Sequence, residues 1–267
     1  MQCVIKAPVL TKQSTITTAS GRYFLTDRIR EEVNFSLTAQ NRGIHPPPLQ
    51  KAVSPESKII PLPPQGAWSI PPCDLQTAIA DRQSHRRFTV AALSLEELSF
   101  LLWATQGVRE VVHEAAVLRT VPSAGCRHPF ETYLAVVRVE GLASALYRYL
   151  PLEHSLVAVR AIDNLPLQLQ AATHGQSFSG RAAVTFLWTV IPERTEWRYG
   201  EASYKVIALD AGHLCQNLYL ACEAISAGTC AIAAYNQTLA DELLGVDGRE
   251  EFCIYLAPVG KVPAKGD

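Results

Sequence analysis

The stretch YKVIALDAGHLCQNLYLACEAI, which spans Tyr204–Ile225, decides the fold of this 267-residue chain. At 3.6 residues per turn, apolar residues gather on one side of a helical wheel and polar residues on the other. The apolar set is Ile207, Ala211, Leu214, Leu218, Ala221, Cys222 and Ile225, and the polar set is Lys205, Asp210, His213, Gln216, Asn217 and Glu223. Because Leu209 and Leu220 interrupt the polar arc, we predict a central helix packed against its own domain and against a second subunit.

The residues directly after this helix are small and apolar. Ala227-Gly228 marks the helix end, because glycine is the usual residue just past a helix C-terminus. Thr229–Tyr235 (TCAIAAY) then predicts a buried strand.

Composition limits the class of protein. With 48% hydrophobic residues, the chain can bury one substantial core. A net charge of -1 argues against a general nucleic-acid binder. The sequence contains no charge-free run of 18 apolar residues, so we expect no transmembrane helix. Its first residues form too short an apolar block for a secretory signal, so we expect a cytoplasmic protein.

The cysteines and standard motifs exclude several kinds of site. Seven cysteines are scattered without a C-x-x-C pair, which indicates reduced, buried thiols rather than a disulfide framework or a zinc site. The sequence also lacks H-E-x-x-H, G-x-G-x-x-G, G-x-x-x-x-G-K-[ST] and G-x-S-x-G. We therefore predict no metal site.

The chain divides into an N-terminal arm, residues 1–72, and a domain, residues 73–267. We expect one short helix near Leu25–Phe35. The second half of the arm is extended, with prolines at positions 46, 47, 48, 55, 61, 63, 64, 71 and 72. A free linker is one interpretation. We favour an arm laid across a domain or a partner subunit, because Ile59, Ile60, Leu62 and Trp68 provide apolar groups for docking.

Capping residues predict the shorter helices of the domain. Asp74 can cap a helix over Leu75–Asp81. Ser94 and Glu97 form a capping box for Leu95–Thr105, which Gly107 ends. We also expect helices over Asp163–Thr173 and over Thr238–Leu244, the latter capped by Thr238 and ended by Gly245.

Strands are predicted where β-branched and aromatic residues concentrate. These segments are Glu131–Val139, Ala145–Leu150, Ser155–Val159, Ala182–Val190 and Glu251–Val259. Helices and strands are interleaved without the strict alternation of a doubly wound sheet. The prediction is an α+β fold with a mixed, mostly antiparallel sheet flanked by helices.

Four short segments could carry chemistry. Arg82–Arg87 (RQSHRR) combines arginines and a serine, which suit a phosphate group, although a solvated basic turn is the simpler interpretation. The Pro122–Gly125 loop permits close backbone approach to a ligand, and Ala231–Tyr235 (AIAAY) could let a planar ligand lie on bare backbone. Lys261 follows a strand. None of these segments is specific by itself.

In order along the chain, these segments resemble the nitroreductase superfamily of flavin mononucleotide (FMN) enzymes, and specifically its SagB/ThcOx-type dehydrogenase branch. The matching blocks are RQSHRRF (82–88), LSLEELSFLLWATQGV (93–108), RTVPSAG (119–125), ERTEWRYGEASYKVIALDAGHLCQNLYLA (193–221), GTCAIAAY (228–235), LLGVDGREEF (243–252) and APVGK (257–261). The D-A-G-H-x-x-Q-N helix is the most distinctive block. The arm matches less well.

The resemblance implies a two-layer homodimer with central helices at the subunit interface and FMN between the protomers. Residues that correspond to phosphate, ribityl and nearby contacts are Arg82, Gln83, Ser84, Arg86 and Lys261. Pro122, Ser123 and Ala124 correspond to a loop over the flavin from the other subunit. Ile232, Ala233 and Ala234 correspond to the stretch beside the isoalloxazine, where Ala233 replaces the usual glycine.

The implied chemistry is hydride transfer through flavin N5, with a tyrosine, a lysine or water exchanging the proton. The nearest candidates for a catalytic lysine–tyrosine pair are Tyr199, Tyr204 and Lys205. One version of the enzyme dehydrogenates a thiazoline or oxazoline in a peptide or related substrate. Another is an NAD(P)H-dependent nitroreductase that reduces small electrophiles. A third hypothesis, of another class, is a non-catalytic flavin-binding scaffold in a biosynthetic complex.

Overall fold

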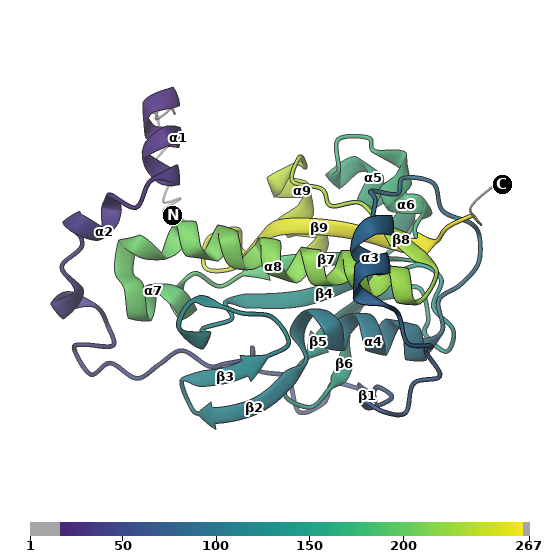
Figure 1. Cartoon of the computed structure of the whole chain (residues 1–267), viewed down its shortest axis with the longest axis horizontal. Helices are drawn as coiled ribbons and strands as arrows, with labels where there is room; N and C mark the ends of the chain where they lie inside the picture. The colour runs from purple at the N-terminus through teal and green to yellow at the C-terminus, as the bar shows by residue number, and fades with distance from the viewer. Residues whose placement is uncertain (1–16, 264–267) are drawn as a thin grey trace, which may run out of the picture.

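The protein is described here by a computed structural model that covers residues 17–263. Cys3 and the apolar block considered as a secretion signal lie outside these residues. Figure 1 shows the long helix α8 (Ser203–Ala224) lying across a twisted sheet, with α1 (Thr18–Leu25) and α2 (Ile29–Glu32) set apart from the main body.

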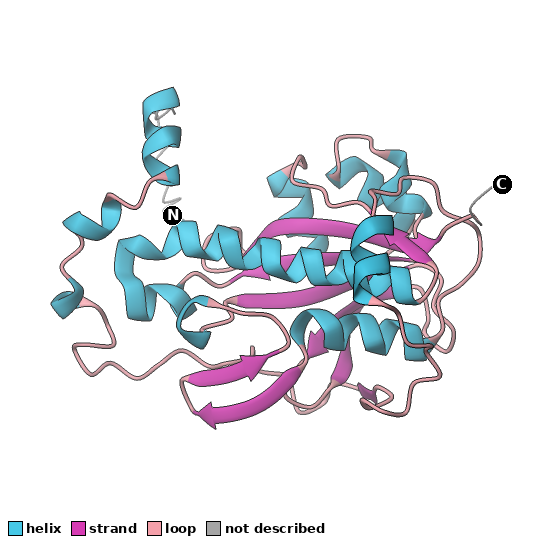
Figure 2. Ribbon diagram, in the orientation of Figure 1, coloured by secondary structure: helices cyan, strands magenta, loops and turns pink. Residues whose placement is uncertain are grey.

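A seven-stranded sheet forms the centre of the fold, in the order β1-β6-β5-β4-β7-β9-β8, and all of its neighbouring strands pair antiparallel (Figure 2). Its strands are β1 (Ile59–Pro61), β4 (Phe130–Val136), β5 (Ala145–Leu150), β6 (Ser155–Arg160), β7 (Val184–Val190), β8 (Ala227–Thr229) and β9 (Phe252–Lys261). The α+β fold and the predicted central strands are therefore confirmed. A separate hairpin of β2 (Val108–His113) and β3 (Ala116–Arg119) was not predicted.

The sheet is covered on both faces, so the two-layer expectation was wrong. α4 (Leu95–Gln106) and α8 pack on one face, over strand residues such as Leu134 and Trp188. The other face carries α5 (Leu165–Ala172), α6 (Ser177–Arg181) and α9 (Gln237–Leu244), over Leu187 and Leu256. Side chains alternate between the faces of a strand, and both sets here are apolar, so each face needs a helical layer.

Local capping set several boundaries as predicted. Asp74 caps α3 (Leu75–Asp81), and the Ser94/Glu97 capping box opens α4. Within residues 17–263, the remaining helical elements are the short helix α7 (Glu193–Tyr199) and three 3-10 turns, at Phe35–Leu37, Ala124–Cys126 and Gly200–Ala202. The cap of α9 is Asn236, not Thr238, because the Asn236 side chain accepts from the Leu239 N–H.

The predicted apolar face of α8 is buried, with Leu214 and Leu218 at 1% and 0% exposure. Leu214 therefore belongs to the core of this chain and not to an outer surface. Asp210 belongs to the polar side of the helical wheel, yet it is also buried, at 5% exposure. Leu209 remains 55% exposed, as an outward-facing helix position requires.

The strand expected over Thr229–Tyr235 was wrong. Pairing with β9 ends at Thr229, and Ile232 makes only an isolated bridge to Leu256. Residues between Cys230 and Asn236 follow an irregular path, with Ala233 and Ala234 exposed.

The Pro-rich segment lies on the domain and does not hang free. Its β1 pairs with β6 and forms the edge of the sheet, where prolines are tolerated, and Leu49 and Leu62 are buried. The single helix predicted near Leu25–Phe35 is instead the α1–α2 pair followed by a 3-10 turn.

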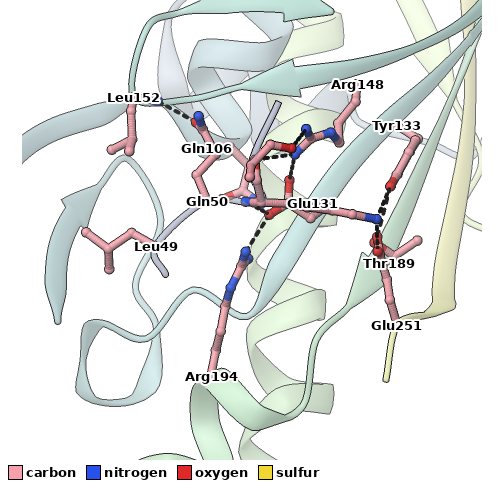
Figure 3. A network of polar contacts seen from close by, with 12 residues as sticks. Leu49, Gln50, Gln106, Glu131, Tyr133, Arg148, Leu152, Thr189, Arg194 and Glu251 are labelled. Carbon is pink, nitrogen blue, oxygen red and sulfur yellow. Dashed lines mark hydrogen bonds and ion pairs between the residues drawn. The ribbon is translucent and has the colours of Figure 1, made fainter. Parts of the chain in front are cut away.

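A buried polar network fixes the middle of this segment (Figure 3). Glu131, with a side chain 2% exposed, receives hydrogen bonds from Arg148, Arg194 and the Lys51 N–H. Arg148 also donates to the carbonyls of Lys51 and Ala52. These buried charges are paired, as a charge away from water requires.

Candidate functional site

The basic segment Arg82–Arg86 follows α3 and runs extended along the sheet edge formed by β8. Ser84 forms a parallel bridge with Thr229, and the His85 N–H donates to the Thr229 carbonyl at 2.9 Å. This close approach requires Gly228, because a Cβ there would lie 2.5 Å from the His85 ring. The segment therefore extends the edge of the sheet through backbone contacts with β8 and is not a solvated turn.

Polar side chains of this segment line an open hollow of ≈ 860 Å³. Gln83, Ser84 and Arg86 are exposed, so their donors are available to a ligand. Asp81 and Glu223 also line the hollow, which gives it acidic as well as basic groups.

Tyr219 of α8 connects this segment to the stretch after β8. Its hydroxyl lies 3.0 Å from Oγ of Ser84 and accepts a 2.8 Å hydrogen bond from the Ala231 N–H. The Arg82 guanidinium lies 5.3 Å from the centre of the Tyr219 ring, within cation–π range. Tyr219 is not among the site residues predicted from the sequence. The available signal was a tyrosine on a largely apolar helix, since a half-buried hydroxyl needs a hydrogen-bond partner.

The predicted ring-contacting stretch lies next to this cluster. Ile232 is buried and exchanges backbone hydrogen bonds with Leu256, which fixes the stretch to β9. Ala233 and Ala234 are exposed, so only methyl groups and backbone face outward there. A flat ligand could approach the backbone closely at this point.

Lys261 ends β9 near the same edge. Its ammonium donates to Oε1 of Glu97 and to the Ile225 carbonyl, both at 2.5 Å. A lysine is favourable at the C-terminus of α8, where carbonyl groups lack helical partners. An ammonium has three N–H donors, so one donor remains for the predicted phosphate contact.

The Pro122–Ala124 loop lies against a different part of α8. Ser123 and the Ala124 N–H both donate to the Asp210 carboxylate, at 2.6 Å and 3.1 Å. Burial raises the pKa of Asp210, and these hydrogen bonds oppose the rise. Tyr199 lies over the loop, close enough that a Cβ on Gly125 would meet its hydroxyl at 2.7 Å.

The other catalytic candidates follow at the start of α8. Tyr204 is 50% exposed and hydrogen-bonds to Glu196, and burial with this carboxylate raises the pKa of its hydroxyl. Lys205 is half-buried. Neither side chain lies in the Arg82–Arg86 hollow.

Within one chain, the predicted site residues therefore form two clusters. One is anchored at Tyr219 and contains Arg82, Ser84 and the stretch after β8. The other is anchored at Asp210 and contains the Pro122–Ala124 loop with Tyr199. The two anchors are nine positions apart on α8, which corresponds to about 13 Å at 1.5 Å per residue.

Residues 17–263 lack two further kinds of feature. This part of the chain contains no cluster of histidine, cysteine or acidic side chains able to hold a metal ion. It also contains no helix long and apolar enough to cross a membrane. The cysteines described there are unpaired, and burial raises the pKa of the Cys215 thiol to about 12.

A family model for the nitroreductase family matches residues 79–261. The chain belongs to the nitroreductase family. MJ1384 of Methanocaldococcus jannaschii, named as a nitroreductase, is 30% identical over 187 residues, which cover 70% of this chain and 90% of that protein. The trifolitoxin-processing protein TfxB of Rhizobium leguminosarum bv. trifolii is 29% identical over 61% of this chain, and the match covers 40% of TfxB.

Solved structures support the nitroreductase fold. A nitroreductase-family protein of Ralstonia eutropha JMP134 superposes with a TM-score of 0.64 and 27% identity, over 83% of this chain and 96% of that one. A chain of the E. coli microcin synthetase McbBCD complex, solved with truncated pro-MccB17 bound, gives a TM-score of 0.58 at 18% identity, over 95% of this chain and 100% of that one. A Desulfovibrio desulfuricans protein in complex with FMN superposes with a TM-score of 0.51 at 20% identity. The match covers 74% of this chain and 91% of that one. The last two similarities concern the fold alone.

Proposed function

We propose that this nitroreductase-family protein is an FMN-dependent oxidoreductase of the SagB type. The observation that supports the proposal is that Tyr219 contacts Arg82, Ser84 and the Ala231 N–H, and so joins a basic, hydroxyl-bearing segment to the stretch that leads to Ala233. FMN is present in a structural relative with the same fold.

The donor chemistry of this edge fits FMN. Arginine forks and a serine hydroxyl suit a terminal phosphate, and Arg82, Ser84 and Arg86 occupy alternate positions of one extended segment. The exposed Ala233–Ala234 backbone suits a planar ring. When bound, FMN would supply two-electron chemistry at that ring. The chain would hold the phosphate and orient the ring.

We propose that two copies of the chain complete the site. The Pro122–Ala124 cluster and the Arg82–Ser84 cluster lie against different parts of α8, about 13 Å apart along the helix. Antiparallel pairing of two α8 helices would bring the Pro122–Ala124 cluster of one copy near the Arg82–Ser84 cluster of the other. The exposed Leu209 on α8 gives such a pairing an apolar contact.

For the substrate, we favour a thiazoline or oxazoline in a peptide or related natural product. The support is the 29% identity to the trifolitoxin-processing protein TfxB and the shared fold with a microcin synthetase chain. NAD(P)H-dependent reduction of small electrophiles is the second candidate, supported by the relative named as a nitroreductase. Both reactions use the same flavin site. A scaffold that binds flavin without turnover is the alternative of another class.

The test of the cofactor is the purified protein itself. We expect a yellow protein that releases FMN on denaturation, and release of FAD or failure to take up FMN would contradict the proposal. Arg82→Ala should weaken FMN binding by about 1.5–3 kcal/mol, the range for a hydrogen bond to a charged group. Arg109→Ala, at an exposed arginine of β2, is the control and should change binding little.

The reaction is then tested with the flavin-loaded protein. A thiazoline-containing peptide that reduces the bound flavin under anaerobic conditions would support the first activity. Reduction by NADH or NADPH followed by reoxidation with a nitro compound would support the second. A flavin that stays oxidised with every donor would indicate the scaffold.

A further inference from the structure

We infer that Tyr219 is a positioning residue that couples the phosphate side of the cofactor site to its ring side. This inference rests on the proposed FMN site. Tyr219 touches both halves of that site: its hydroxyl meets Ser84 and the Ala231 N–H, and its ring meets Arg82. We place no direct contact between Tyr219 and the cofactor.

The directions of the hydrogen bonds around the Tyr219 hydroxyl follow from which neighbouring groups can donate and which can accept. The Ala231 N–H can only donate, so it occupies one lone pair of the Tyr219 oxygen at 2.8 Å. Among residues 17–263, the Tyr219 proton then has one neighbour within hydrogen-bond distance able to accept it, Oγ of Ser84 at 3.0 Å. With Tyr219 donating, the Ser84 proton is left to point away from the helix. Ser84 is thereby prepared as a donor for an anionic oxygen.

The same hydroxyl sets the start of the ring-contacting stretch. Ala231 precedes Ile232, whose backbone is already fixed to Leu256 by hydrogen bonds of 2.7 and 3.2 Å. Between the end of β8 at Thr229 and this bridge, the Tyr219 hydroxyl fixes the Ala231 N–H in place of a strand partner. Loss of the hydroxyl would leave this donor without its acceptor and would loosen the backbone that leads to Ala233.

The Tyr219 ring acts separately from its hydroxyl. The Arg82 guanidinium lies 5.3 Å from the ring centre, which restricts the arginine to one side of the extended segment. Tyr219→Phe keeps this ring and removes only the hydroxyl. The substitution therefore isolates the link between Ser84 and Ala231.

The experiment measures the Kd for FMN of flavin-stripped protein by fluorescence quenching, and the visible circular dichroism of the bound flavin. Tyr219→Phe should raise the Kd by about tenfold, as expected for one lost hydrogen bond, and should change the dichroism. Ser84→Ala should raise the Kd similarly. Because part of the Tyr219 effect passes through Ser84 and part through Ala231, the double variant should raise the Kd by more than Ser84→Ala alone but by less than the product of the two single effects.

The control is Tyr147→Phe. Tyr147 belongs to the core cluster against which Tyr219 packs, and its hydroxyl donates a 3.0 Å hydrogen bond to the Ala143 carbonyl. This variant should leave Kd and dichroism unchanged. Unchanged Kd and dichroism in Tyr219→Phe, with only a lower urea midpoint, would assign Tyr219 a structural role and overturn the inference while FMN binding stands. The inference would also be overturned if the Kd increase of the double variant equalled the product of the increases in Tyr219→Phe and Ser84→Ala. Failure of the wild-type protein to bind FMN would overturn both this inference and the proposed function.

Discussion

Oγ of Ser123 donates a 2.6 Å hydrogen bond to Oδ2 of Asp210, although 87 positions separate the two residues in sequence. The Ala124 N–H donates to the same carboxylate. The loop after β3 is thus fixed to α8 by a buried acceptor, and its geometry depends on one side chain of the helix.

Asp210→Ala should therefore destabilise the protein by about 1–3 kcal/mol, because the half-buried donors Ser123 and Ala124 lose their buried acceptor. Urea unfolding measures the loss. Asp163→Ala, which removes an exposed carboxylate before α5, should shift the midpoint far less. Equal shifts in both variants would contradict the anchoring role.

Leu209→Arg should dissociate the proposed dimer and release FMN, because it places a charge on the outward face of α8. Light scattering and the flavin-to-protein absorbance ratio report the two effects. Leu167→Arg, at a 65% exposed leucine on the opposite face of the sheet, should leave both unchanged. A fully flavinated wild-type monomer would disprove the two-copy site. Leu214→Arg is unsuitable here, because Leu214 is buried within the chain's own core.

Glu131→Gln should destabilise the protein by about 3–5 kcal/mol, the cost of breaking a buried ionic cluster, since Arg148 and Arg194 would lose their counter-charge. Chemical unfolding is the measurement. Glu153→Gln is the control: Glu153 also contacts the arm, through Gln50, but at an exposed position. A small loss at Glu131 would show that the network is not needed to hold the Pro-rich segment.

His128 should make the protein acid-sensitive. Burial, followed by the nearby Arg119 charge, lowers the pKa of His128 to about 3, against 6.5 in the unfolded chain. As the pH falls below 6.5, the unfolded state gains a proton that the folded state excludes, so stability decreases toward pH 3. The loss approaches about 1.4 kcal/mol per pH unit, or roughly 2 kcal/mol at pH 5.

The matched variants are His128→Asn and His174→Asn, since both histidines have positive φ angles, 43° and 53°, which asparagine tolerates. Replacing the buried His128 should flatten the stability profile between pH 6.5 and 5. Replacing the exposed His174 should leave the pH dependence of stability unchanged. Identical profiles for the two variants would assign the acid sensitivity to other groups.

Several local elements could be predicted from residue types alone. The Ser94/Glu97 capping box, the Asp74 cap and Gly245 after α9 act through bonds within one helical turn, so their residue types predict their structure. Apolar spacing likewise identified α8, and the ordered motifs predicted the family and a candidate cofactor site.

The pairing of distant polar groups could not be predicted from the sequence, because it depends on how the chain folds. Asp210 follows the polar side of the α8 wheel, yet it is buried because the Pro122–Ala124 loop covers it. Tyr219 meets Ser84 across 135 positions, a separation that no local pattern encodes. The second helical layer over the sheet and the irregular path of Cys230–Asn236 also depend on long-range packing. Contacts of this kind form only when distant segments fold together, because neither partner constrains the other along the chain.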